Sequence, residues 1–319
     1  MPSITATLVS LYVKWVLQSK VLFDSPDNTL KSLNDLHIRP KDFHPPTNLG
    51  LDIFIDRVDV HDWPLYRLST EDPSFKKEPR KALLYIHGGA FFREIHTQHW
   101  RLTAQVARET DLDVLIPIYP LLPRPGATAQ KLAAGLIDIC RLSKQPVVSV
   151  AGDSAGGMLA LSTCQQLRDT QPELAAQVRS LILISPVLDC ALEHPEVVRL
   201  AEVDPWLGLN GLRAIMPILA GDLPVKNPIV SPLFGDMANL PPILLLSGTH
   251  DMLCADARRL KSKFAGGDVD EAPAGSVEMD RFVYIEKEAM IHVWPALPHP
   301  EGAEGRKTII HFINMHLQE

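Results

Sequence analysis

The sequence lacks several features that would assign a chain to a familiar class of protein. It has only four cysteines among 319 residues and no C-x-x-C pair, which argues against a zinc site and against a dense disulfide framework. It has no Asn-x-Ser/Thr acceptor, no P-loop and no G-x-G-x-x-G motif. We therefore expect free thiols in a reducing compartment, a cytoplasmic protein and no cofactor.

Positive charge is sparse as well. Lysine and arginine together number 31 against 38 acidic residues, so the formal net charge is -7, which argues against nucleic-acid binding. The densest basic cluster is predicted to be the solvated face of a helix, and it comprises Arg258, Arg259, Lys261 and Lys263. His96 and His99 stand three residues apart without a third ligand, so no metal site is predicted.

No apolar run is long enough to be a confident membrane span. Residues 4–17 are apolar, but they include Lys14 and lack the basic start and cleavage site of a signal peptide. Residues 4–20 are predicted to form an amphipathic helix with an apolar stripe of Leu8, Leu11, Tyr12, Trp15 and Val16. We expect this stripe to pack on its own domain or to cover an active site, with a shallow membrane contact as the alternative.

Beyond this segment, short β-rich runs recur along the chain. The first two alternate apolar and polar residues and predict antiparallel strands, whereas most later runs are separated by helical patterns such as 97–110 and 130–142. This order predicts an α/β protein with a mainly parallel sheet covered by helices on both faces. The eight runs are 51–56, 63–68, 81–86, 114–119, 147–151, 181–184, 243–247 and 282–285.

Three other segments have a different character. Residues 191–226 are helical in pattern and stand where a short crossover would have sufficed, so they are a candidate lid. Residues 266–280 are polar and acidic, with Gly, Ala and Pro, and predict a mobile surface loop. Residues 305–318 predict a final helix that docks on the core.

The stretch that organises the chain is 147–161, an apolar run interrupted by small residues. It contains the pattern Gly152-x-Ser154-x-Gly156 between a predicted strand and a predicted helix, which is typical of a nucleophile elbow. Small residues on either side allow the strand and the helix to pass closely, and the serine hydroxyl then stands exposed at the turn. Ser154 is therefore the candidate nucleophile.

A serine nucleophile needs a histidine to accept its proton and a carboxylate to orient that histidine. Asp251 follows the predicted strand 243–247, and His292 follows the run 282–285, which gives the order serine, acid, histidine. The rival residues fit less well, because each has another explanation or leads away from the site. These rivals are Asp189, His250, His299, His311 and His316.

Acyl transfer also requires backbone N–H groups directed at a developing oxyanion. The loop His87-Gly88-Gly89-Ala90 can supply those of Gly88 and Gly89, and Ala155 at the start of the next helix can supply a third. Large apolar side chains are candidates for the wall of the substrate pocket, although any of them could be core. They are Phe91, Phe92, Trp206, Leu207, Met216 and Trp294.

Four motifs occur in order, and together they resemble those of the hormone-sensitive-lipase-like α/β hydrolases. They are His-Gly-Gly-Ala-Phe-Phe at 87–92, Gly-Asp-Ser-Ala-Gly-Gly at 152–157, Ser-Pro-Val-Leu-Asp at 185–189 and His-Val-Trp at 292–294. The resemblance spans about 82–292. It departs from the family at Tyr119-Pro-Leu-Leu-Pro-Arg, where such enzymes usually have Tyr-Arg-Leu-Ala-Pro-Glu, and at Ala90, which replaces a frequent third glycine.

The resemblance implies an α/β-hydrolase fold with an eight-stranded sheet and a helical cap. We expect cap helices in 1–46, a catalytic domain in 47–319, and a contribution of 191–226 to the cap. It also implies a serine carboxylesterase that acts on a short- to medium-chain or natural-product ester. A biosynthetic enzyme for lactone opening, product release or elimination is the alternative, and a ligand receptor is a further one. A homodimer and a weak membrane contact of the N-terminal helix are further expectations.

Overall fold

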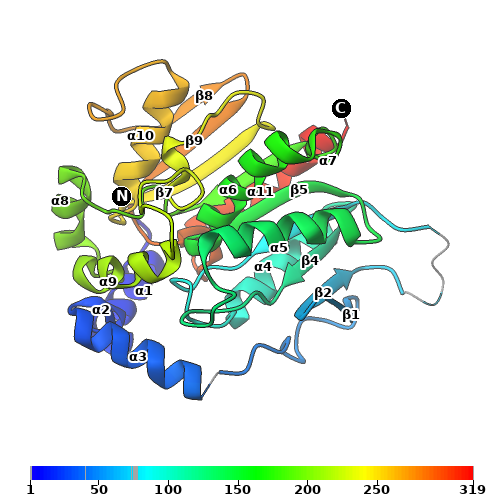
Figure 1. The fold of residues 1–319 in the computed structure, drawn as a ribbon, viewed down its shortest axis with the longest axis horizontal. Coiled ribbons are helices and arrows are strands. Elements are labelled where there is room, and N and C mark those ends of the chain that lie inside the picture. The colour runs from blue at the N-terminus through cyan, green and yellow to red at the C-terminus, as the bar shows by residue number, and fades with distance from the viewer. Residues whose placement is uncertain (1, 40, 73, 75–77, 319) are drawn as a thin grey trace.

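A nine-stranded sheet runs through the molecule (Figure 1). The computed structural model describes residues 2–39, 41–72, 74 and 78–318, so residues 1 and 319, the outer bounds of the two predicted domains, lie outside it. The strand order is β1-β2-β4-β3-β5-β6-β7-β9-β8. The strands are β1 Phe54–Val60, β2 Trp63–Ser69, β3 Ala82–Ile86, β4 Asp113–Pro117, β5 Val147–Asp153, β6 Ser180–Ile184, β7 Ile243–His250, β8 Val277–Met279 and β9 Phe282–Ile291.

The prediction of a mainly parallel sheet is confirmed. The five pairings from β4 through β3, β5, β6 and β7 to β9 are parallel, and the pairs β1/β2, β2/β4 and β8/β9 are antiparallel. The predicted count of eight strands is one too low. The additional strand is β8, which lies inside the predicted surface loop 266–280 and pairs with the start of β9. Three residues are too few to show a strand periodicity in sequence.

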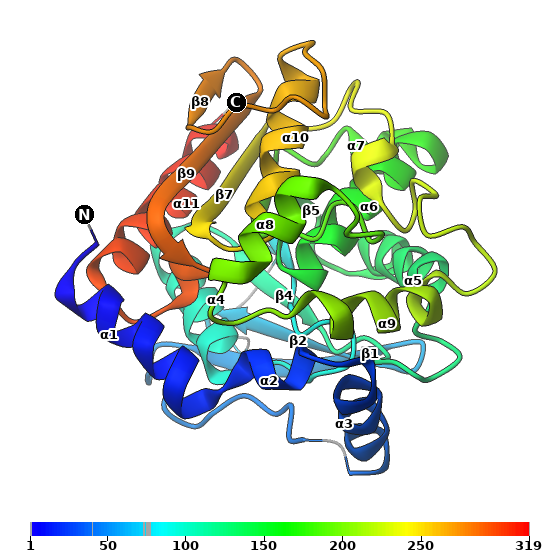
Figure 2. The ribbon, with the colours of Figure 1, turned by 90° about the vertical axis from the view of Figure 1, so that its left-hand side faces the viewer.

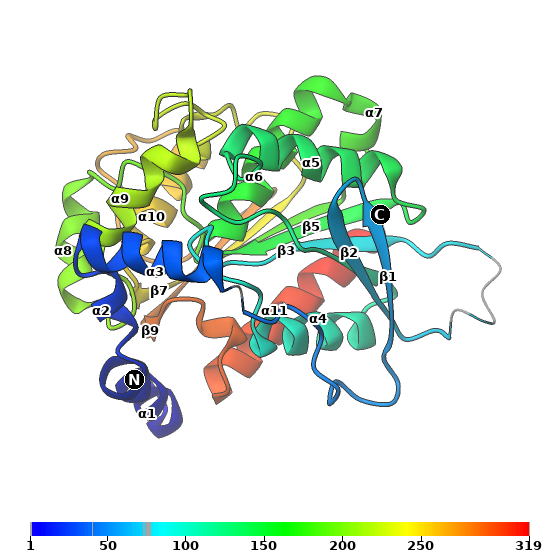
Figure 3. The ribbon, with the colours of Figure 1, turned by 60° about the horizontal axis from the view of Figure 1, so that its bottom comes forward.

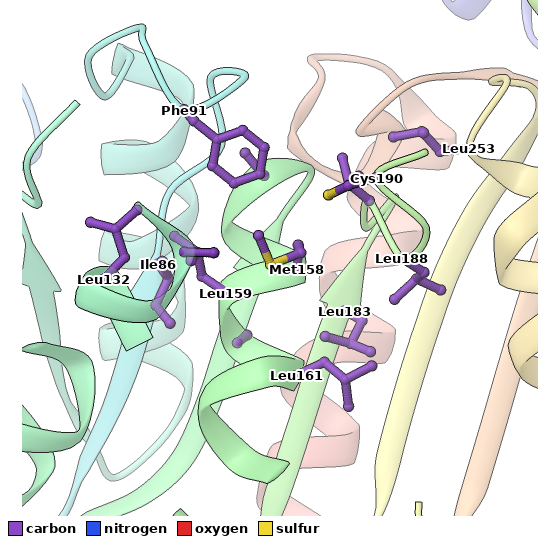
Figure 4. Packing of buried hydrophobic residues seen from close by; sticks show 14 of the residues in the cluster. Ile86, Phe91, Leu132, Met158, Leu159, Leu161, Leu183, Leu188, Cys190 and Leu253 are labelled. Carbon is purple, nitrogen blue, oxygen red and sulfur yellow. The ribbon is translucent and has the colours of Figure 1, made fainter. Parts of the chain in front are cut away.

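Helices cover both faces of the sheet (Figure 3). One face carries α5, α6 and α10, and the other carries α4 and α11. In Figure 4, Met158 and Leu161 of α6 lie over Leu183 of β6. The helices are α1 Ile4–Tyr12, α2 Ser19–Phe23, α3 Pro26–Ile38, α4 Thr97–Glu109, α5 Ala129–Leu142, α6 Ala155–Thr170, α7 Pro172–Ala175, α8 Pro195–Val203, α9 Leu209–Ala220, α10 Cys254–Phe264 and α11 Pro300–Leu317, with a π-helix η1 Val13–Leu17 and 3-10 turns η3 Pro232–Phe234 and η4 Trp294–Ala296.

Helices α2 and α3 lie beside α8 and α9, far from them in sequence (Figure 2). A Cβ on Gly211 of α9 would lie 2.1 Å from the Thr29 hydroxyl of α3, so the two helices are in close contact. Lys20 of α2 donates to the carbonyls of Ala201 and Asp204 at the end of α8, at 2.5 and 2.9 Å. The longest helix between residue 20 and the end of the predicted cap helices is α3, which Ser25 caps by accepting the N–H of Asn28.

The helix predicted over residues 4–20 is present as α1 and η1, but its apolar stripe is not packed on the protein. The exposed fractions of Leu8, Leu11, Tyr12, Trp15 and Val16 lie between 45% and 66%. The helix rests on its opposite side, where Ala6 and Val13 are buried. Val13 packs with Ile291 and Leu297, and Ser3 donates its N–H and hydroxyl to Glu301 of α11. The expectation that the stripe packs on its own domain is therefore wrong.

The basic cluster on α10 is also placed differently from the prediction. Arg258 and Arg259 are less than one-tenth exposed, and each forms ion pairs with carboxylates of other segments. The ammonium groups of Lys261 and Lys263 donate to backbone carbonyls. These partners are distant in sequence, so the local pattern could not reveal them. Arg258 and Arg259 therefore form internal ion pairs, and the two lysines hold neighbouring backbone segments, so the cluster is not a solvated face.

Candidate active site

The predicted nucleophile elbow is present between β5 and α6. Ser154 has φ of 53° and ψ of −119°, a backbone conformation that residues other than glycine rarely adopt. The close approach depends on the flanking glycines: a Cβ on Gly152 would lie 2.3 Å from the carbonyl oxygen of Gly156, and one on Gly156 would lie 2.0 Å from that of Ile86. Any larger residue at these positions would push α6 away from β3 and β5.

Three side chains from three loops form a continuous hydrogen-bonded chain. His292 Nε2 lies 2.9 Å from Ser154 Oγ, and His292 Nδ1 lies 2.9 Å from Asp251 Oδ2. The other Asp251 oxygen accepts the N–H of Leu253 at 2.9 Å. With its proton on Nδ1, the imidazole donates to the carboxylate and accepts from the serine hydroxyl. The structure thus brings together the three residues that the sequence order predicted.

The surroundings of His292 favour its charged form. Burial lowers the pKa of His292, but the charge of Asp251 and its hydrogen bond outweigh burial, so this pKa is raised above its ordinary value. Asp204 and Asp153 add to the effect. The site can therefore hold a proton on His292 while an anion forms beside it.

The loop that follows β3 is held next to Ser154. The hydroxyl of Tyr119 donates to the His87 carbonyl at 2.6 Å, and the two rings stack at 4.5 Å. Gly89 and Ala90 have positive φ, of 127° and 51°. Gly88 differs from the expectation, because its N–H donates to Asp153 Oδ1 at 3.0 Å and is therefore already engaged.

Asp153, next to the nucleophile, is a buried residue that sequence reasoning did not single out. Its carboxylate accepts from the Tyr85 hydroxyl at 2.6 Å, from Gly88 N–H, and from His99 Nε2 at 3.2 Å. Burial raises the pKa of Asp153, but His99, Tyr85 and Gly88 outweigh burial and lower it to about 2. This carboxylate thus fixes the 87–92 loop against the elbow, and its position within Gly-Asp-Ser could have indicated this.

The two histidines considered as a metal pair serve helix α4. His99 Nδ1 accepts the N–H of His96, and the His96 side chain accepts in return from the first turn of the helix. Burial lowers the pKa of His96 to about 3 and that of His87 to about 4, so both remain neutral. His96 and His99 therefore hydrogen-bond to each other's segments at the start of α4.

The predicted pocket residues are divided between the site and the core. Trp206, in the loop between α8 and α9, meets the ring of His292 edge-on, with centroids 5.9 Å apart and an interplanar angle of 80°. Five others are nearly fully buried in the apolar clusters, namely Phe91, Phe92, Leu207 and Met216 in one and Trp294 in the other. Phe91 belongs to the loop after β3, and its ring lies above the start of α6 (Figure 4).

The rival acid and histidines have other partners or positions. Asp189 pairs with Arg259 at 2.9 Å. His299 caps α11 by accepting the N–H of Gly302, and His316 donates to the Phe312 carbonyl. His250 and His311 are exposed. The four cysteines are free, as predicted, and the structure shows that all four are buried.

Comparisons with known proteins agree with this geometry. A family profile described as α/β hydrolase fold matches residues 83–272. An esterase of Acinetobacter venetianus is 29% identical over 247 residues, which are 76% of this chain and 80% of the relative. An acetyl-hydrolase of Streptomyces hygroscopicus is 31% identical over 239 residues, 73% of this chain and 74% of the relative.

Among solved structures, an esterase from the bacterial hormone-sensitive lipase family superposes with a TM-score of 0.70 at 23% identity, and the match covers 99% of both chains. This similarity extends the shared fold to nearly the whole chain, including the N-terminal helices. The chain therefore belongs to the hormone-sensitive-lipase-like α/β hydrolases and is a serine carboxylester hydrolase.

Proposed function

We propose that this hydrolase works through an acyl-enzyme formed on Ser154. The Ser154 oxygen attacks the ester carbonyl carbon while its proton passes to His292 Nε2, and Asp251 stabilises the resulting imidazolium. Collapse of the tetrahedral intermediate breaks the bond to the alcohol, which leaves with the proton from His292. A water molecule then gives its proton to His292, attacks the acyl carbon and releases the acid, and the proton returns to Ser154.

We propose that the N–H groups of Gly89 and Ala155 donate to the oxyanion of the tetrahedral intermediate. Ala155 is the first residue of α6, and the first N–H groups of a helix have no partner within it. Gly88 has a different role in this proposal. A Cβ there would lie 2.3 Å from Asp153 Oδ2, so its small size lets the loop approach the elbow.

One observation carries the proposal: His292 contacts both Ser154 and Asp251 at 2.9 Å within a buried site. A ligand receptor would not need this chain of hydrogen bonds. A specialised biosynthetic hydrolase would need it and remains the second candidate, because the same acyl transfer opens a lactone or releases a product.

Replacing Ser154 with alanine tests the mechanism. The variant should lose hydrolysis of 4-nitrophenyl acetate and butyrate while its circular dichroism spectrum stays native, because the hydroxyl alone is removed. Undiminished hydrolysis would contradict the assignment. A wild-type protein that a fluorophosphonate labels at Ser154, but that hydrolyses no simple ester, would instead favour the biosynthetic candidate.

We propose a short- to medium-chain acyl group as the substrate's acid part. Ser154 is only 8% exposed, and the ring of Trp206 meets that of His292 edge-on, so little of the nucleophile faces solvent. Relatives whose names specify an acyl group or ester include the acetyl-hydrolase above and an ethyl acetate hydrolase of Pseudomonas putida. A series of 4-nitrophenyl esters should show kcat/KM falling as the acyl chain lengthens beyond eight carbons.

We also propose that 1–46 and 191–226 form a cap over the catalytic domain of 47–319. The close packing of α3 on α9 and the bonds from Lys20 to the end of α8 support this division. The exposed face of α1 and η1 would make the weak membrane contact. This face presents large apolar side chains with Lys14 as its neighbouring cation, and no described helix is long and apolar enough to cross a bilayer.

A further inference from the structure

Asp204 is a second buried carboxylate close to the triad. It follows α8, is 1% exposed, and belongs to the loop that continues to Trp206. Its Oδ1 accepts the N–H groups of Trp206 and Leu207, at 2.7 and 2.9 Å. Three residues of the loop are therefore tied together by one carboxylate oxygen.

The other oxygen of Asp204 reaches the segment that carries the triad acid. Asp204 Oδ2 accepts the N–H of Met252 at 2.9 Å, and Met252 directly follows Asp251. The next N–H, that of Leu253, goes to Asp251 itself. One turn of backbone thus donates to both carboxylates, which fixes the α8–α9 loop relative to Asp251.

From these contacts we infer that Asp204 is a positioning residue for the triad, holding Asp251 from one side and Trp206 against His292 from the other. It does not itself touch the nucleophile or the proton that moves. The inference rests on the proposed roles of Ser154, Asp251 and His292.

Burial and the nearby charge of Asp251 both disfavour the ionised form of the Asp204 carboxylate. Burial, and then the charge of Asp251, raise the pKa of Asp204 to about 6, while its bonds to Leu207 and Met252 N–H and the proximity of His292 lower it. Lys20, on the N-terminal side, donates to the Asp204 carbonyl and not to its carboxylate. A neutral Asp204 would have one hydroxyl in place of an acceptor, so at least one of its three bonds would weaken as the pH falls through this value.

Asparagine is the informative replacement at this position. In Asp204→Asn the amide oxygen can still accept from Trp206 and Leu207, but the amide nitrogen faces the Met252 N–H, so two donors oppose each other. The substitution therefore disturbs the Asp251 side while it preserves the loop. Trp206→Phe makes the complementary change on the His292 side.

We expect kcat/KM of Asp204→Asn to fall about tenfold, mostly in kcat, because small displacements of catalytic groups are costly in rate. The acid limb of its pH profile should also move to lower pH, because Asp204 helps to raise the pKa of His292. Glu202→Gln changes an exposed carboxylate in α8, two residues before Asp204; it is the matched control and should leave both unchanged. The double variant Asp204→Asn/Trp206→Phe should be less impaired than the product of the two single effects.

The labelling rate of Ser154 with a fluorophosphonate separates the possible failures. If wild-type Ser154 does not react, the proposed function itself is wrong. If wild-type Ser154 reacts and the folded Asp204→Asn protein reacts at the same rate, with an unchanged pH profile, Asp204 is a structural residue only and the inference is overturned. Slower labelling with a shifted profile supports it, and thermal unfolding identifies any misfolded variant.

Discussion

At the scale of single residues, the His292–Asp251 pair makes a pH prediction. His292 must be neutral to accept the Ser154 proton, and its pKa is raised, so kcat/KM should fall as the pH drops through a value above 6.5. In Asp251→Asn the acid limb should move to lower pH and kcat should fall by about 10³–10⁴-fold, because the imidazole loses its orientation and its counter-charge. A pH–rate profile of both proteins measures this, and an unmoved limb would contradict it.

The same raised pKa has a consequence for stability. The folded state binds the His292 proton more tightly than the unfolded chain does. The stabilisation from this group is therefore complete below about pH 6.5, the unperturbed value, and is lost as the pH rises through the raised pKa. The pH range in which catalysis needs His292 neutral is thus the range in which its proton no longer stabilises the fold.

Gly156 illustrates why the elbow depends on particular residues. In Gly156→Ala the new Cβ would lie 2.0 Å from the Ile86 carbonyl oxygen, so α6 must move away from β3. We expect the free energy of unfolding to fall by about 1–3 kcal/mol or more and activity to be lost with it. Gly126→Ala, whose Cβ would have ordinary contacts of 3.5 Å, is the control. Equal denaturation midpoints for the two variants would contradict the role of Gly156.

At the scale of elements, the ion pairs of α10 fasten this helix to β9 and α8. Arg258 lies 2.8 Å from Glu286 and 2.9 Å from Glu196, and Glu286 is nearly buried. Arg258→Ala should lower the free energy of unfolding at pH 7 by about 3–5 kcal/mol, because it leaves the Glu286 carboxylate buried without its ion-pair partner and, among the described residues, with only the Tyr284 hydroxyl as a side-chain donor. Arg199→Ala, which removes an exposed partner of Glu196, should cost about 0–1 kcal/mol.

The pH dependence of this difference is a further check. Burial raises the pKa of Glu286, but the hydrogen bond and charge of Arg258 outweigh it, so the pKa is lowered. The stabilisation is therefore present above the ordinary carboxyl value of 4.5 and is lost as the pH falls through the lowered one. Urea denaturation should show the wild-type and Arg258→Ala curves approaching each other in acid. A difference in the free energy of unfolding that stays constant with pH would show that Arg258→Ala acts through lost packing instead.

At the scale of the whole molecule, the apolar face of α1 and η1 should decide binding to lipid. Flotation with vesicles of equal parts phosphatidylcholine and phosphatidylserine should recover the wild-type protein. Leu8→Glu and Trp15→Glu should abolish the binding, because each places a charge where an apolar side chain would be buried. Leu51→Glu, at a fully exposed leucine outside this face, is the control and should still bind.

Light scattering tests whether this face instead binds a second copy of the chain. A dimer that the same two substitutions dissociate, together with no vesicle binding by the wild type, would assign the face to a second copy of the chain. Vesicle binding that Leu8→Glu and Trp15→Glu leave unchanged would exclude the face from the contact. Either result contradicts the proposed membrane contact.

The sequence by itself determined the alternation of strands and helices, the nucleophile elbow, and the order of Ser154, Asp251 and His292. These features are local: the close approach of Gly152 to Gly156 lies within the Gly-Asp-Ser-Ala-Gly turn itself, and apolar runs reveal buried strands. The places of Asp251 and His292 just after predicted strands joined the three residues into one site independently of the resemblance to a known family. The 2.9 Å contacts between them agree with that reading.

Tertiary structure alone decided what depends on partners distant in sequence. Arg258 and Arg259 look like a solvated face until Glu286 and Asp189 are placed beside them. The Gly88 N–H looks free until Asp153 is folded against it, and the N-terminal stripe looks like a packing face until Ala6 and Val13 are found on the inner side. Asp204 gives no local signal, because its role comes from Met252 and Trp206 meeting at one carboxylate. Periodicity reports which residues are apolar, whereas only the fold specifies which polar groups face each other.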